Sequence, residues 1–209
     1  DVLFILLPSI RFNFILVNLN KMENILVNKR NKIHPHKFAL WAAMASITMM
    51  FGAFTSAYIV KQAAGNWLEF AMPVSFYIST LLIIISSVTL HISFSSFKIG
   101  NQSRYKSMLI VSLLLGVAFV IFQYFGWTEL YAKGVDLKGN VSGSFFFLIS
   151  GIHALHVIGG IAALIVATLH AYTLKFNVTE KRINRFDLVL NYWHFVDFLW
   201  IYLFIFLII

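Results

Sequence analysis

Cysteine is absent from the 209-residue chain, and charged residues are scarce. The absence of cysteine excludes disulfides, thiolate zinc sites, iron–sulfur clusters and cysteine nucleophiles. Asp, Glu, Lys and Arg make up 11% of the residues, too few to cover the surface of a soluble domain of this length. Apolar residues make up 60%, and the mean hydropathy is +0.83. These values predict a polytopic membrane protein rather than a soluble one.

Proline is also rare, and all three prolines lie outside five long apolar runs. A helix of roughly 20 apolar residues crosses the hydrocarbon core of a bilayer, and each run reaches that length. We therefore predict an all-α membrane bundle with transmembrane helices at about 38–60, 74–97, 108–130, 144–174 and 188–209, which form one domain.

Residues 1–37 precede the five runs and are expected to form an interfacial, basic cytoplasmic segment. Residues 1–21 lie before the first methionine, Met22. They are interpreted either as a segment on the membrane surface or as a processed or over-extended start.

The basic residues are distributed unevenly between the two ends of the runs. Thirteen of the 16 Lys and Arg residues lie on the side that holds residues 1–37, and three lie on the other side. The positive-inside rule therefore predicts a cytoplasmic N-terminus and a C-terminus on the opposite side. The same rule explains the net charge of +8, so nucleic acid is not expected as a partner.

The last run contains two ionisable residues, His194 and Asp197, which are three apart and share a helix face. A carboxylate at the centre of a bilayer costs about 2.5–3.5 kcal/mol on insertion scales, so Asp197 is expected to face protein rather than lipid. Two interpretations stay open. The pair is either hydrogen-bonded packing between helices, or a proton-relay or ligand position as in a small membrane transporter centred on Asp197.

Other histidines raise the question of metal or haem binding. His153 and His156 share a helix face, but no Glu-x-x-His motif accompanies them, and a metal site is not predicted. His91 and His170 lie near the inner ends of their runs, where two histidines on facing helices could ligate a haem b. A haem-binding membrane anchor is therefore an alternative hypothesis.

Two motifs resemble the subunit III family of the haem–copper respiratory oxidases. They are GSFFFLISGIHALHVIGG at 143–160 and NYWHFVDFLWIYLF at 191–204, and a looser resemblance extends from Pro35 to Ile209. The resemblance implies the five-helix, bacterial-type form, located in the cytoplasmic (inner) membrane. It also implies that the chain binds no haem, copper or other metal and has no active site of its own. The haem and copper of the oxygen-reducing, proton-translocating enzyme are expected in partner subunits.

The resemblance further implies a role and a set of partners. The chain would pack against subunit I, associate with subunit II and smaller subunits, hold structural phospholipids, and support proton uptake and stability. Membership of a larger respiratory supercomplex is also compatible with it. Cytochrome c is the expected electron donor, and a quinol oxidase is the alternative. We expect Arg104 and Arg185 to contact lipid head groups.

Specific residues follow from the same resemblance. His153, His156, Trp193, His194 and Asp197 would form a polar core between the helices and support subunit packing. Many members of the family have a glutamate in the helix that corresponds to 38–60, and alignment on Gly52 places Ser46 at that position. Whether Ser46 replaces a proton-antenna glutamate is left open by the sequence.

Overall fold

The structure is a computed structural model that describes residues 35–65 and 67–208. It separates into two compact units, residues 1–38 and residues 39–209, and the arrangement below is that of the second unit. The expectations for residues 1–34 lie outside the described residues.

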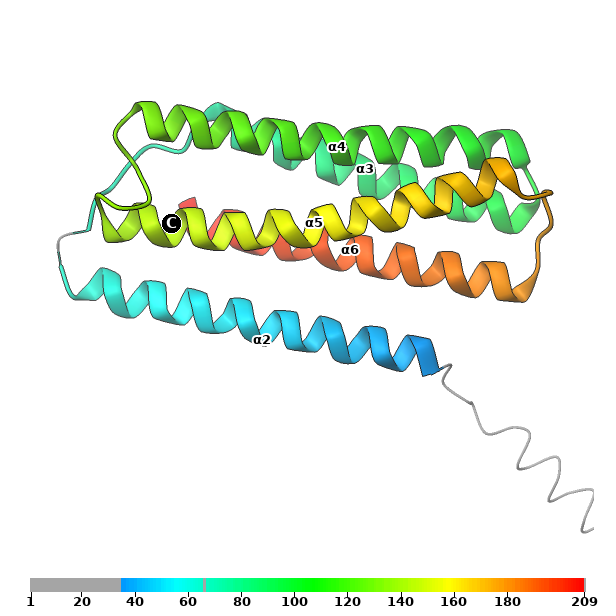
Figure 1. The fold of residues 1–209 in the computed structure, drawn as a ribbon, viewed down its shortest axis with the longest axis horizontal. Helices are drawn as coiled ribbons and strands as arrows, with labels where there is room; N and C mark the ends of the chain where they lie inside the picture. Colours follow the sequence, from blue (N-terminus) through cyan, green and yellow to red (C-terminus); the bar gives the residue numbers. More distant parts are fainter. Residues whose placement is uncertain (1–34, 66, 209) are drawn as a thin grey trace, which may run out of the picture. The chain divides into compact units, whose positions relative to one another are not determined.

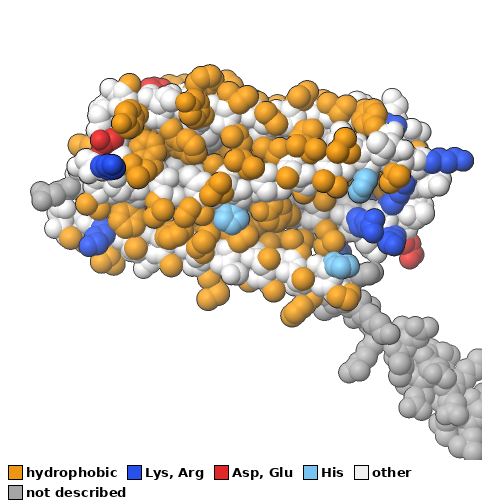
Figure 2. Space-filling model, viewed as in Figure 1, with side chains coloured by type: hydrophobic (Ala, Val, Ile, Leu, Met, Phe, Trp, Pro, Cys, Tyr) orange, Lys and Arg blue, Asp and Glu red, His pale blue; other side chains and the backbone are white. Residues whose placement is uncertain are grey.

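Five helices make up the described chain, and it contains no strand. They are α2 (Pro35–Ala63), α3 (Val74–Ile99), α4 (Gln102–Ala132), α5 (Val141–Thr173) and α6 (Glu180–Ile208) (Figure 1). Each is long and apolar enough to cross a membrane, which confirms the predicted all-α fold with five membrane-spanning helices. Figure 2 shows hydrophobic side chains along the helices and Lys and Arg gathered at their two ends.

The helices extend past the apolar runs. The helix α6 begins at Glu180, although the sequence suggested a loop as far as Asp187. The backbone N–H groups of Arg182 and Ile183 both donate to the Thr179 carbonyl and start the helix. The difference arises because hydropathy marks the part of a helix that lies in hydrocarbon, whereas charged residues such as Glu180 are good helix formers outside it.

Short polar turns connect the helices of the bundle. Gly100 adopts a positive φ of 84° after α3, and Asn101 then caps α4 by accepting a hydrogen bond from the Arg104 N–H. Asn140 caps α5 in the same way through the Ser142 N–H. Since these turns are short, consecutive helices from α3 to α6 are antiparallel neighbours.

Four of the helices form a closed ring. Close backbone approaches join α3 to α4, α4 to α5, α5 to α6, and α6 back to α3. The α3–α4 pair is the tightest, because Ser79, Ser86 and Ser93 recur every seven residues on the buried face of α3. Ser86 donates to the Ser112 carbonyl at 2.9 Å, and Ser93 donates to the Tyr105 carbonyl at 2.9 Å. Small hydroxyl side chains thus permit close approach and also bind the neighbouring backbone.

The helix α2 attaches to this ring differently. None of its Cα atoms makes the close approaches that join the other described helices, and it packs through large side chains instead. Phe51 is fully buried and packs with Ile149 of α5 and with Leu199 and Leu203 of α6. The hydroxyls of Thr55 and Tyr202 share a hydrogen bond of 3.2 Å. Aromatic contacts therefore hold α2 to α5 and α6.

Trp193 of α6 is 1% exposed, and its indole lies against α4 and α5. A Cβ atom added to Gly116 of α4 would lie 2.7 Å from its indole ring, and one added to Gly160 of α5 would lie 2.9 Å from it. Both distances are shorter than a normal carbon–carbon contact. Glycine is therefore required on both sides of this indole.

Candidate functional site

Asp197 lies on the face of α6 that is turned toward α3, and it is 3% exposed. Ser87 of α3 lies close to its carboxylate, yet neither carboxylate oxygen has a hydrogen-bond partner among the described residues. Ser87 instead shares a short hydrogen bond of 2.5 Å with the Nδ1 atom of His194. Asp197 therefore faces protein, as the sequence predicted for a carboxylate at this depth.

His194 also contacts a histidine of α3. Its ring lies 5.9 Å from that of His91, measured between centroids, and the two planes are tilted by 37°. His194 is half-buried and His91 is exposed. A polar group formed by His91, Ser87, His194 and Asp197 thus runs from the bundle interior to its α3–α6 face.

His153 and His156 lie on α5 and form a separate group. The His153 ring stacks on Trp200 at 4.9 Å and meets the edges of Phe51 and Phe119. It is fully buried, and neither ring nitrogen has a partner in the described part of the chain. His156 donates from Nδ1 to the Ile152 carbonyl at 2.8 Å.

The five predicted polar-core residues are therefore not one hydrogen-bonded cluster. His153 and His156 meet aromatic rings of α2, α4 and α6, whereas His194 and Asp197 meet α3. Trp193 lies at the level of Gly160 and Gly116. All five lie between helices, and their contribution to subunit packing stays a prediction.

The structure also places the residue that the sequence aligned with a family glutamate. Ser46 is exposed on α2, and its neighbour Ile47 packs against the cluster around Phe51. The apolar side chain at 47 therefore occupies the interior face of α2 at this level.

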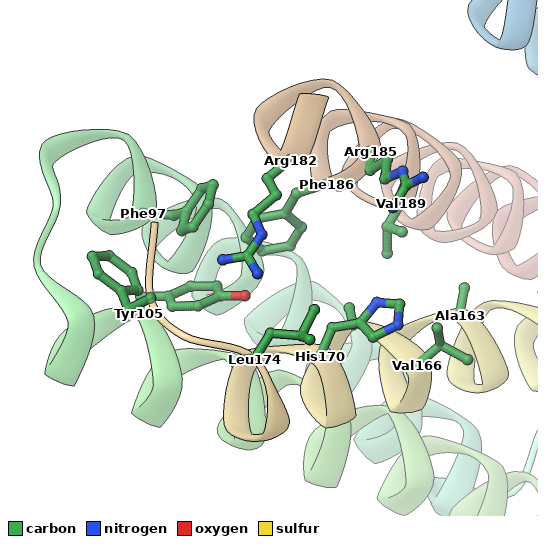
Figure 3. Close-up of a pocket in the computed structure, with 13 residues that line it drawn as sticks. Phe97, Tyr105, Ala163, Val166, His170, Leu174, Arg182, Arg185, Phe186 and Val189 are labelled. Carbon is green, nitrogen blue, oxygen red and sulfur yellow. The ribbon is translucent and has the colours of Figure 1, made fainter. Parts of the chain in front are cut away.

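A cavity of about 280 Å³ lies where α5 and α6 meet. Ala163, Ala167 and Val189 form part of its apolar wall, and the aromatic rings of Phe97, Tyr105, Phe176 and Phe186 form another part. Figure 3 shows the side chains of His170, Arg182 and Arg185 around it. The cavity thus combines an apolar interior with basic groups.

Arg182 is fixed in this cavity by the loop between α5 and α6. Its Nη1 atom donates to the Lys175 carbonyl at 2.7 Å and to the Asn177 carbonyl at 3.3 Å. Figure 3 shows its guanidinium directed toward the Tyr105 hydroxyl. Arg185, a predicted lipid contact, also lines the cavity, whereas Arg104 is exposed at the start of α4 and does not line it.

The histidines considered as haem ligands lie in different environments. His91 lies against His194, and His170 lines the cavity described above. The helices that carry them, α3 and α5, are not neighbours in the ring. Within the described ranges, no three His, Cys, Asp or Glu residues are grouped closely enough to hold a metal ion.

Several residues of these groups were missed by reasoning from sequence. Ser87 and Thr80 of α3 both bind side chains of α6. Ser87 shares its hydrogen bond with His194, and the Trp200 Nε1–H donates to the Thr80 hydroxyl at 2.9 Å. Gly116 was missed because a single glycine in an apolar run carries no packing signal. The seven-residue spacing of the α3 serines was the one available signal for that helix face.

These features define a class of protein: a multi-pass membrane helix bundle with polar groups between its helices. The family model described as "Cytochrome c oxidase subunit III" matches residues 38–209. The chain belongs to the cytochrome c oxidase subunit III family.

Curated relatives carry the same name. A probable cytochrome c oxidase subunit 3 of Nocardia farcinica is 31% identical over 171 residues, which cover 77% of this chain and 81% of the relative. The corresponding protein of Mycobacterium leprae is 32% identical over 170 residues, with the same two coverages. Cytochrome c oxidase subunit 3 of Rattus norvegicus is 34% identical over 128 residues, covering 61% of this chain and 47% of the relative.

The family match confirms the resemblance to subunit III that the two sequence motifs indicated. Membership implies that the chain is part of a multi-subunit oxidase complex and is a multi-pass membrane protein. The matching relatives are named for cytochrome c, and the quinol alternative is not favoured.

Proposed function

We propose that this chain is a non-catalytic subunit III of a proton-pumping haem–copper oxidase in a bacterial cytoplasmic membrane. In this proposal it packs against subunit I, and subunit II and smaller subunits belong to the same complex. The partner subunits, not this chain, bind the haem and copper. Cytochrome c supplies the electrons. The family match over residues 38–209 is the observation that carries the proposal.

The second part of the proposal is that the cavity at the α5–α6 end holds the head group of a phospholipid. Arg185, Arg182 and His170 supply positive or hydrogen-bonding groups for a phosphate, and the aromatic and alanine walls suit glycerol and the first carbons of the acyl chains. A cavity of about 280 Å³ accommodates a head group but not a whole lipid. The acyl chains would lie along the outside of α5.

Two arginines of this chain provide a matched test of lipid binding. The oxidase is purified in mild detergent with the wild-type chain, with Arg185→Ala and with Arg104→Ala, and the retained phospholipids are quantified by mass spectrometry. We expect Arg185→Ala to lose bound lipid, because it removes a charge from the cavity wall. Arg104→Ala is the comparison: Arg104 is also expected to contact a head group, but it does not line the cavity, so its replacement should leave the lipid of the cavity bound. Equal retention in both variants would contradict the assignment.

The third part of the proposal is support of proton uptake and of stability during turnover. It rests on membership of the family rather than on a proton path in this chain. Buried ionisable groups are divided between two groups, His153 with His156 and His194 with Asp197, which no hydrogen bond between described residues connects. Without this chain, the oxidase is therefore expected to reduce oxygen at its normal initial rate but to lose that activity sooner during turnover. The time course of oxygen consumption by the oxidase with and without this chain tests that expectation.

A further inference from the structure

The face formed by α3 and α6 carries two rows of exposed or half-buried side chains. On α3 the row is Leu81, Ile84, Val88, His91 and Ser95, spaced alternately three and four residues apart. On α6 it is Asn191, His194, Phe198 and Ile205, and Tyr202 at the edge of this row hydrogen-bonds to Thr55 of α2. The Ser87–His194 hydrogen bond and the His91–His194 ring contact join the two rows into one surface, the α3–α6 face.

Much of this face is as apolar as any lipid-exposed surface. Val88 is 55% exposed and Phe198 is 72% exposed. The face of α4 has similar spacing at Leu114, Val117 and Ile121, and these too are exposed. Spacing and hydrophobicity alone therefore do not distinguish the α3–α6 face from a surface that meets only acyl chains.

The two imidazoles do distinguish it. His91 precedes Lys98 by seven residues, and His194 follows Asp187 by seven residues. At 1.5 Å per residue, both lie about 10 Å deeper than the charged level of their helices. Because Cα–Cβ bonds tilt toward the N-terminus of a helix, the His91 side chain points further into the bilayer rather than back toward Lys98.

Hydrogen bonding on this face is incomplete at that depth. The Nδ1 atom of His194 is used by Ser87, but its Nε2 atom and both ring nitrogens of His91 form no hydrogen bond with the other described residues. Acyl chains offer no hydrogen-bond partner, and a polar group left unpaired in hydrocarbon is costly. Ionisable residues within membrane helices accordingly face protein or water rather than lipid.

We propose that the α3–α6 face binds a transmembrane helix of another oxidase subunit, and that this helix carries a hydrogen-bonding side chain at the depth of His91 and His194. The inference rests on the proposed function, since it takes the partner from the oxidase complex. The flanking side chains Ile84, Val88 and Phe198 supply apolar contacts to the same partner helix. The Ser87 hydroxyl binds Nδ1 of His194 and fixes the orientation of its ring from the side of α3.

Photocrosslinking in the purified oxidase tests this proposal directly. The photoreactive residue p-benzoylphenylalanine is placed at the position of Val88 in one variant and at that of Val117 of α4 in the other. After irradiation, adducts are identified by mass spectrometry of the purified complex. We expect position 88 to form an adduct with a transmembrane segment of another oxidase subunit, and position 117 to form lipid adducts only.

Three results would overturn the proposal: lipid adducts alone at both positions, protein adducts at 117 but not at 88, or an adduct from 88 to a second copy of this chain. The experiment also separates the proposal from the function on which it rests. If the chain does not purify with an oxidase, the proposed function fails. If it does purify with one and position 88 meets only lipid, this inference alone fails.

A second measurement tests the role of the imidazole itself. Release of the chain from the complex is timed in increasing detergent for His91→Leu and for Val117→Leu, which keeps an apolar side chain on the α4 face. Loss of one interhelical hydrogen bond should speed the release of His91→Leu roughly threefold to tenfold. His91→Gln, which can still donate and accept, should restore part of the difference. Equal release of His91→Leu and the control would contradict a polar contact at this depth.

Discussion

The packing of Trp193 between two glycines allows a sharp prediction about the bundle. Substitution Gly160→Ala would place a methyl group 2.9 Å from the Cε3 atom of an indole that is almost fully buried. The indole cannot move away easily, because Gly116 lies equally close to the neighbouring Cζ2 and Cη2 atoms of the same ring. Overpacking of this kind costs about 1–3 kcal/mol.

The matched control lies on the same helix. Gly151 has no atom of another side chain or helix within 4 Å of an added Cβ atom, so Gly151→Ala is accommodated. Both substitutions gain helix propensity, by up to about 1 kcal/mol, and this gain cancels when the two variants are compared. The free energy of unfolding of Gly160→Ala should therefore be lower than that of Gly151→Ala by about 1–3 kcal/mol.

Equilibrium unfolding of the purified chain in mixed micelles of mild detergent and dodecyl sulfate, followed by circular dichroism, measures this difference. The double variant Gly160→Ala with Trp193→Leu adds a thermodynamic cycle. Because the smaller side chain relieves the clash, the cost of Gly160→Ala should decrease in that background. Equal stability of Gly160→Ala and Gly151→Ala, or the same cost with Leu at 193, would refute the packing argument.

Three further predictions concern α2, Asp197 and orientation. Phe51→Ala should destabilise the attachment of α2 by about 3–5 kcal/mol and increase protease cleavage between α2 and α3, whereas Phe38→Ala, at a position 65% exposed, should not. Asp197→Leu should reduce retention of the chain in the oxidase more than Asp197→Asn, which keeps a polar side chain beside Ser87; equal retention would show that polarity at 197 is not needed for assembly. Since the chain has no cysteine, single variants Ser103→Cys and Lys138→Cys can be labelled in intact cells with an impermeant maleimide; the positive-inside rule predicts labelling only of Lys138→Cys, and the reverse result would invert the orientation.

The fold could be predicted from sequence because membrane insertion depends on local composition. Five apolar runs separated by polar turns require five helices, since a lipid-exposed backbone must satisfy its hydrogen bonds internally. The helix ends were less predictable, and α6 begins eight residues before its predicted apolar run starts at 188. Hydropathy does not report that a helix continues into water.

The arrangement of the polar residues could be predicted only in part. Helical spacing placed His194 and Asp197 on one face, and both lie between helices as expected. It could not show that His91 joins His194 or that His153 stacks on Trp200, because these contacts depend on which helices are neighbours in the ring. The cavity between α5 and α6 likewise depends on the fold of the loop that joins them, to which Arg182 hydrogen-bonds.

Affinity purification of the tagged chain in mild detergent tests most directly whether the chain is a subunit of a haem–copper oxidase. Mass spectrometry and an optical spectrum then identify the proteins and haems that accompany it. We predict recovery together with a haem- and copper-bearing subunit I and with subunit II. Recovery of the chain alone, or only with copies of itself, would contradict the proposed function.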